Sequence, residues 1–315
     1  MSENSKRAPL LTRTWAVALL ACIACALWGS AFSTIKIGYA VFGITPSDVP
    51  SEILFAGIRF MLAGLIAIAL GSALNRRIAL PRPSSWGMVA RLALFQTVLQ
   101  YVFYYIGVSH ASGVKSSIIN SLNTFFAILL ASLVFHQEKL TRRKLAGCAL
   151  GIAGVVLINL TGRGFDPGLR LDGEGFVAVS AFAYAVSSVL IHRFSQVEDP
   201  VALSGSQFLL GGAAMAAAGF ALGGRVDLAD GGAAGAGILF YLGIISGVAY
   251  SLWALLLKYN DVSRVSIFGF MNPVFGVIFA SILLGEAGKV PAWQCAAALA
   301  LVSAGIVVVN RHARP

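Results

Sequence analysis

The segment FAGIRFMLAG at Phe55–Gly64 recurs as LSGSQFLLGG at Leu203–Gly212, about 148 residues later. A second segment, LNTFFAILLASL at Leu122–Leu133, recurs at nearly the same spacing as MNPVFGVIFASI at Met271–Ile282. One spacing shared by several apolar segments indicates that the chain contains a duplicated unit. In membrane proteins such a duplication is typical of secondary transporters, whose substrate site lies where the two copies meet.

The composition indicates a membrane protein. Hydrophobic residues make up 58% of the 315-residue chain and charged residues 11%, whereas soluble domains are about 45–50% apolar and about 25% charged. The net charge of +10 comes from basic residues in short segments between apolar runs. Such charges set orientation in a membrane, while nucleic-acid binding would need a basic face on a soluble surface. We therefore expect lipid as the surroundings and no nucleic-acid partner.

Ten segments are long and apolar enough to be membrane spans, which need roughly 20 residues each. They cover residues 14–37, 52–73, 86–108, 114–135, 144–161, 174–194, 201–221, 235–257, 262–284 and 291–310. The first five belong to one copy of the repeat, residues 1–162, and the last five to the other, residues 163–315. The sequence predicts one all-α transmembrane domain built from these two units.

Basic residues predict the orientation. With the N-terminus inside, sixteen of the 23 Lys and Arg residues fall on the inner side and five on the outer side. This asymmetry places both termini in the cytoplasm. Because each unit holds five spans, an odd number, the second unit enters the membrane from the opposite side. The repeats are therefore expected to be inverted, which would let them exchange conformations and open a shared cavity to either side in turn.

Polar and aromatic side chains gather on single faces of several spans. The third span carries Thr97, Tyr101 and Tyr104 at i, i+4 and i+7, and Gln96 and Gln100 form a second line. The candidate substrate-binding residues are Trp28, Ser30, Gln96, Gln100, Tyr101, Tyr104, Asn120, Asn123, Tyr184, Ser187, Ser246, Tyr250, Trp253 and Asn272. These side chains either line a site for an amphipathic organic solute or hydrogen-bond between helices.

Three further residues inside predicted spans bear on mechanism. Pro273, after Asn272, removes a helix hydrogen bond, and we interpret it as a hinge or as a structural kink; the first half has Thr124 at this place. Arg59, whose repeat mate is Gln207, either meets a substrate carboxylate or pairs within the protein. Lys36 lies toward an outer helix end and can extend to the interface.

The sequence lacks the groups that enzymes and ion-coupled transporters use. No acidic residue lies near the middle of a span, which favours a facilitator without ion coupling. The histidines lie near helix ends or loops, and the Cys22-x-x-Cys25 pair has no second pair or histidine beside it. We expect no enzyme activity, no cofactor and no metal. A membrane sensor or scaffold that moves no solute is the alternative from another class.

The order of these motifs resembles the EamA branch of the drug/metabolite transporter superfamily. The resemblance is carried by Trp28-Gly29-Ser30, Ala249-Tyr250, Trp253, Asn272-Pro273 and Glu286, and covers nearly the whole chain. It implies a central cavity lined by spans one, three, four, six, eight and nine, and alternating access. Thr124 departs from the proline that members of the branch often carry, which puts a symmetric hinge in doubt.

Within that branch the chain is most similar to bacterial inner-membrane exporters of aromatic and other amino acids. The resemblance therefore implies export of amino acids and related small metabolites. The alternative is an exporter of drugs, nucleosides or sugars, with proton coupling as an option. We expect a monomer; a dimer through the small-residue face Gly147-x-x-x-Gly151 remains the alternative.

Overall fold

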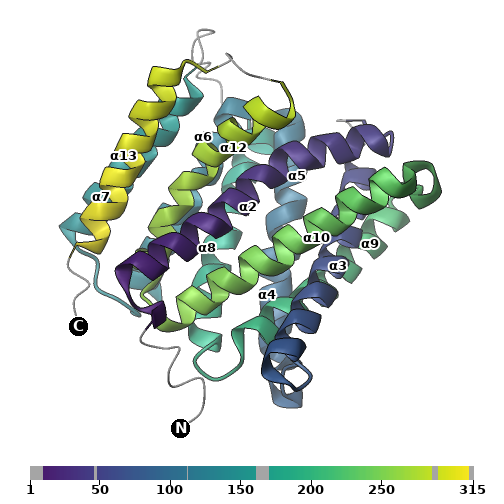
Figure 1. Cartoon of the computed structure of the whole chain (residues 1–315), viewed down its shortest axis with the longest axis horizontal. Coiled ribbons are helices and arrows are strands. Elements are labelled where there is room, and N and C mark those ends of the chain that lie inside the picture. Colours follow the sequence, from purple (N-terminus) through teal and green to yellow (C-terminus); the bar gives the residue numbers. More distant parts are fainter. Residues whose placement is uncertain (1–9, 46–47, 112, 161–169, 286–289, 312–315) are drawn as a thin grey trace.

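The computed structural model describes residues 10–45, 48–111, 113–160, 170–285 and 290–311. Helices are the only regular secondary structure in these ranges (Figure 1). They are α2 (Thr14–Val41), α3 (Val49–Asn75), η1 (Pro83–Ser85), α4 (Trp86–Leu92), η2 (Ala93–Leu99), α5 (Gln100–His110), α6 (Gly113–Leu129), η3 (Leu130–Val134), α7 (Arg142–Asn159), η4 (Leu171–Gly175), α8 (Phe176–Phe194), α9 (Pro200–Ala221), α10 (Leu228–Tyr259), α11 (Val262–Ser266), η5 (Ile267–Phe270), α12 (Met271–Leu283) and α13 (Ala292–Asn310).

These helices confirm the predicted all-α membrane fold. Within the described residues, nine helical stretches are long and apolar enough to cross a membrane. The remaining predicted span, residues 144–161, corresponds to α7. This helix has 18 residues and is less apolar, because it begins with Arg142, Arg143 and Lys144. It packs along α13, as Figure 1 shows. The predicted boundary between the two units, at residues 162–163, lies outside the described residues and stays a prediction.

Several helices extend further than the sequence pattern predicts. The second span begins at Val49 instead of residue 52, because Asp48 caps the helix by accepting a hydrogen bond from the Ser51 backbone N–H at 3.2 Å. Pro50 in the first turn fits this start, since a proline there removes no helix hydrogen bond. One consequence is that Glu52 lies in the first turn of the helix instead of being its first residue.

The helix contacts follow the symmetry of an inverted repeat. The second spans of the two halves, α3 and α9, pack against each other, as do the fifth spans, α7 and α13. The first span α2 contacts α10 and α12 of the second half, and correspondingly α8 contacts α5 and α6 of the first half. Exchange of the halves converts one set of contacts into the other, so a pseudo-two-fold axis passes between α3 and α9 and between α7 and α13.

Glycines allow α3 and α9 to approach closely on this axis. A Cβ atom at Gly64 would lie 2.6 Å from the carbonyl oxygen of Gly205, and one at Gly212 would lie 2.9 Å from that of Gly57. These two contacts are repeat mates of each other. Small residues bring membrane helices close because lipid supplies no hydrophobic force between them and close packing must do so.

The bundle has two ends, which we name by their residues. The start of α2 and the end of α13 lie at one end, the terminal face, and the end of α2 lies at the other, the opposite face (Figure 1). At the terminal face Glu198 accepts hydrogen bonds from Ser85 Oγ at 2.6 Å and Arg82 Nε at 3.1 Å. Burial opposes ionisation of Glu198, but hydrogen bonds from Ser85, Asp199 and Arg82 lower its pKa to about 2. The charged carboxylate thus links the loop after α3 to the loop after α8.

The glycine contact can be tested by adding one methyl group. Gly64→Ala would force α3 and α9 apart, so we expect the free energy of unfolding to fall by about 1–3 kcal/mol, measured by thermal unfolding in detergent. The control is Gly237→Ala on an exposed part of α10, where a Cβ atom meets nothing within 4 Å. Alanine favours helix over glycine, so the control should be as stable as the wild type or more so. Equal stability of both variants would contradict the close packing.

Candidate functional site

A cavity lies where the two halves meet. It has a volume of about 240 Å³ and adjoins a second volume of about 380 Å³. Both volumes are lined by Lys36, Tyr104, Asn120, Asn123 and Asn272. The helices that line them include the six expected spans, and α3 contributes as well. The lining reaches the opposite face, because it includes residues at the beginning of α3 and at the end of α12.

Aromatic repeat mates form the floor of the cavity. The hydroxyls of Tyr101 and Tyr250, which occupy matching places in the two halves, lie 2.9 Å apart and share a hydrogen bond. Phe60 and Phe208 are also repeat mates, and their rings stack with centroids 5.2 Å apart and planes 2° from parallel. Trp28 meets Tyr250 edge-on at 4.9 Å. The floor therefore lies on the pseudo-two-fold axis.

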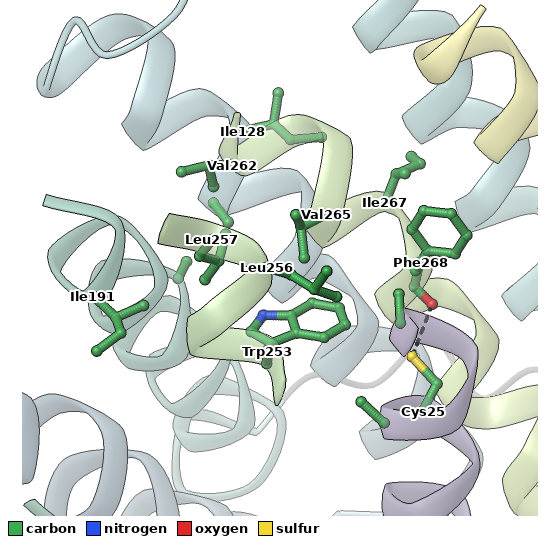
Figure 2. Close-up of a cluster of buried hydrophobic side chains, with 14 of the residues drawn as sticks. Cys25, Ile128, Ile191, Trp253, Leu256, Leu257, Val262, Val265, Ile267 and Phe268 are labelled. Carbon is green, nitrogen blue, oxygen red and sulfur yellow. Dashed lines mark hydrogen bonds between the residues drawn. The ribbon is translucent and has the colours of Figure 1, made fainter. Parts of the chain in front are cut away.

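A hydrophobic cluster fills the space between this floor and the terminal face. Figure 2 shows its residues converging from α2, α6, α8, α10, α11 and η5. Trp253, Leu256, Leu257 and Val265 are each 2% exposed or less. The thiol of Cys25 donates a hydrogen bond to the Phe268 carbonyl oxygen at 3.2 Å. The cavity is thus open toward the opposite face and closed toward the terminal face.

A buried carboxylate joins the two halves below this cluster. Glu138, in the loop before α7, accepts hydrogen bonds from the backbone N–H of Ser263 at 3.2 Å and from its hydroxyl at 2.8 Å. The ammonium of Lys144 lies 3.2 Å from the same carboxylate. Burial raises the pKa of Glu138, while Lys144 and Ser263 oppose this shift. Its repeat mate, Glu286, lies outside the described residues.

Ten of the fourteen candidate residues line the cavity. They are Trp28, Gln100, Tyr101, Tyr104, Asn120, Asn123, Tyr184, Ser246, Tyr250 and Asn272. Pro273 lines the adjoining volume. Most of these side chains come from the two tyrosine-bearing faces and from the amide line of α6, where the helical spacing indicated a shared face.

Trp253 and Gln96 do not line the cavity. Trp253 is 2% exposed and belongs to the cluster below the floor, with its ring 5.0 Å from that of Trp28. The amide oxygen of Gln96 accepts a hydrogen bond from Gln207 Nε2 at 3.0 Å, and Thr97 donates to the Gln207 oxygen at 2.7 Å. Gln96 and Thr97 therefore bind α9 across the repeat interface.

A π-helical turn accounts for the position of Gln96. The sequence pattern assumes a continuous α-helix from Thr97 to Tyr104, but residues Ala93–Leu99 form the π-helix η2. A π turn holds more residues than an α turn, so the residues in η2 are rotated relative to those in α5. The rotation turns Gln96 and Thr97 toward α9 while Tyr101 and Tyr104 face the cavity.

Ser30 and Ser187 also lie outside the cavity lining. The Ser30 hydroxyl donates to the Leu27 carbonyl oxygen at 2.8 Å and lies 3.1 Å from the Tyr241 hydroxyl. Ser187 donates to the Tyr184 carbonyl oxygen at 2.7 Å. Ser30 therefore joins α2 to α10, as the alternative of a hydrogen bond between helices predicts, whereas the Ser187 bond lies within α8.

The cavity lining also includes residues that were not predicted from the sequence. Tyr39 and Tyr105 line the cavity, as does Glu52, which is 5% exposed. The sequence predicts no acidic residue near the middle of a span, and Glu52, in the first turn of α3, lines the cavity from the end of its helix. Its spacing of seven residues from Arg59, which puts both on one face of α3, is the signal that could have identified it.

The ninth span is broken next to Pro273. The helix is α in α11, 3₁₀ over η5 and α again from Met271. Pro273 cannot donate a hydrogen bond to the preceding turn, and this loosens the helix there. Thr124, the repeat mate of Pro273, donates to the Ser266 carbonyl oxygen at 3.1 Å and so satisfies a group at the break. The matching helix α6 continues through Asn123 and Thr124, as expected from the lack of proline.

Known proteins share this architecture. The model of the EamA-like transporter family matches residues 15–160 and again residues 172–311, once for each half. A crystal structure of another protein matches with a TM-score of 0.75, 24% sequence identity and coverage of 95% of this chain and 98% of that chain. At this identity the likeness is one of fold.

Two relatives are similar over most of their length. An uncharacterized transporter of Archaeoglobus fulgidus is 30% identical over 269 residues, which cover 85% of this chain and 89% of the relative. A probable amino-acid metabolite efflux pump of Salmonella typhimurium is 26% identical over 306 residues, which cover 92% of this chain and 93% of the relative. The cavity between two inverted halves agrees with these similarities. The chain is a multi-pass membrane transporter and belongs to the EamA-like transporter family.

Proposed function

We propose that the protein exports amino acids, aromatic ones among them, and related small organic metabolites by alternating access. The observation that carries this proposal is the cavity on the pseudo-two-fold axis, which has an aromatic floor and polar walls and is open at one face only. The efflux pump of Salmonella typhimurium, similar over nearly its whole length, supports amino-acid metabolites as the class of solute.

The cavity chemistry suits a small amphipathic solute. Trp28, Tyr101 and Tyr104 offer flat apolar surfaces, and such contacts favour aromatic and aliphatic side chains. The amides of Asn120 and Asn123 lie in the same lining and can donate and accept hydrogen bonds. These groups bind a polar main-chain part and an apolar side chain together, without a covalent step.

The closure below the floor supports alternating access. Because the halves are inverted copies, the arrangement that closes the terminal face has a counterpart that would close the opposite face. The contacts that would break are those of the Trp253 cluster and of Glu138 with Ser263. Glu52 places a carboxylate in the cavity wall, in the first turn of α3, and this group supports proton coupling as the alternative to a facilitator.

We further propose that the protein lies in the bacterial inner membrane with both termini in the cytoplasm, as the basic residues indicate. The described cavity then opens outward. A green fluorescent protein fused to the C-terminus should fluoresce, because this reporter matures in the cytoplasm and not after export through the general secretion route. A fusion that is expressed but dark, while an exported alkaline phosphatase fusion is active, would reverse the orientation.

Flux through liposomes tests the function. Liposomes that contain the purified protein should release labelled phenylalanine or threonine faster than liposomes without protein. Tyr104→Ala removes an aromatic wall from both parts of the cavity, so the KM for phenylalanine should rise about three- to tenfold. The control Tyr259→Ala changes a tyrosine outside the described cavity lining and should leave the KM unchanged.

The same liposomes separate the alternatives. Flux of a nucleoside or sugar panel without flux of amino acids would replace amino acids as the solute class, and no flux of any solute would favour a sensor or scaffold. Repeating the assay with a pH gradient imposed across the membrane shows whether amino-acid release depends on protons.

The break in the ninth span generates a prediction on rate. Pro273→Ala restores a backbone donor next to η5 and stiffens the helix. If the break is the hinge of alternating access, transport should slow several-fold at unchanged expression and unchanged substrate affinity. The control Pro291→Ala changes the N-cap of α13, away from the cavity. An unchanged turnover rate in Pro273→Ala would show that the break is only structural.

A further inference from the structure

Arg59 is a buried cation in the wall of the cavity. Its side chain is 2% exposed and lies on α3, among the residues that line the cavity. The guanidinium carbon lies 4.4 Å from the ring centroid of Phe60 and 5.6 Å from that of Tyr101. The positive charge is therefore held beside the aromatic floor, at the repeat interface.

This cation forms no ion pair within the described part of the chain. No acidic side chain there lies in ion-pair contact with Arg59, and its Nε atom is buried without a hydrogen-bond partner. Other cations at the two ends of the bundle are paired: Lys115 with Glu174 at 3.1 Å, and Lys144 with Glu138 at 3.2 Å. A guanidinium removed from water without a partner is costly, so a group that binds an anion is indicated.

The second half of the chain shows that the fold does not need this charge. The repeat mate Gln207 is fully buried, and both ends of its amide are hydrogen-bonded, to Gln96 and to Thr97. A neutral amide thus satisfies this position of the scaffold. Arg59 occupies this position in one half only, and there it lines the cavity.

The surroundings of Arg59 select among anions. A guanidinium binds a carboxylate through two parallel hydrogen bonds, and the aromatic rings beside it suit an apolar body attached to that carboxylate. Lys36 also lines the cavity but is exposed near the opposite face, and Glu52 lies two helical turns from Arg59 toward that face. Arg59 is the cation nearest to the aromatic floor among the described lining residues.

We propose that Arg59 binds the carboxylate of the transported solute and thereby selects carboxylate-bearing solutes over neutral ones. This inference rests on the proposed function and narrows it. It favours amino acids and other organic carboxylates, and it disfavours sugars and nucleosides, which carry no carboxylate. The aromatic rings hold the guanidinium in place for this contact.

Three ligands with one aromatic body test the inference: phenylalanine, 3-phenylpropionate, which lacks the ammonium group, and phenethylamine, which lacks the carboxylate. Their Kd values are measured by calorimetry with detergent-solubilised full-length protein. Arg59→Gln, which copies the residue of the other half, should raise the Kd of both carboxylates about tenfold or more. The Kd of phenethylamine should change less than twofold. Arg59→Lys keeps the charge but loses the paired donors. Its Kd values for the two carboxylates should therefore lie between those of Arg59→Gln and the wild type.

Control variants separate binding from folding. Arg225→Gln removes an exposed cation in the loop after α9, outside the cavity lining, and should change the carboxylate Kd values less than twofold. Equal weakening of all three ligands in Arg59→Gln, no weakening of any, or an equal loss of carboxylate affinity in Arg225→Gln would overturn the proposal. If Arg59→Gln does not fold, the same ligand comparison is made with Arg59→Lys, for which an unchanged ratio of carboxylate to amine affinity would overturn it.

The outcomes for the proposed function are separate. If wild-type liposomes carry phenylalanine and Arg59→Gln carries it equally well, the carboxylate contact is wrong and amino-acid transport stands. If wild-type liposomes carry no amino acid but 3-phenylpropionate binds in an Arg59-dependent way, amino-acid transport is wrong and the carboxylate site stands.

Discussion

The close packing of α3 against α9 is the constraint on which the rest of the structure depends. In lipid the helices gain nothing from hiding apolar surface, so they must be brought together by backbone approach at small residues. Gly57, Gly64 and their repeat mates provide it. This contact aligns the two halves, stacks Phe60 on Phe208 and brings the tyrosines of α5 and α10 within hydrogen-bond distance.

Much of this architecture could be predicted from the sequence. The recurring spacing and the odd number of spans per unit are properties of the chain itself, and they require an inverted arrangement once lipid is the solvent. Faces of the cavity such as Tyr101 with Tyr104 and Asn120 with Asn123 followed from helical spacing, because side chains three or four residues apart share a face.

The rest could not be predicted, because it depends on departures from the ideal helix and on conformation. The π turn in the third span rotates Gln96 away from the cavity, and no residue type announces such a turn. The Asp48 cap lengthens α3 at its start, and Glu52 in the first turn lines the cavity. Tyr104 and Trp253 are repeat mates, yet one lines the cavity and the other is buried below it. Sequence symmetry cannot distinguish them, since one conformation treats the two halves differently.

The position of the α3–α9 and α7–α13 contacts on the pseudo-two-fold axis has a mechanical consequence. In the alternating access that we propose, the two halves exchange shapes, and a contact between repeat mates is then mapped onto itself, so its bonds need not be broken. The contacts of α2 and α8 are mapped onto each other and must be remade. The glycine-lined helix pairs therefore keep their contacts during this exchange, and α2 and α8 are the helices that move relative to them.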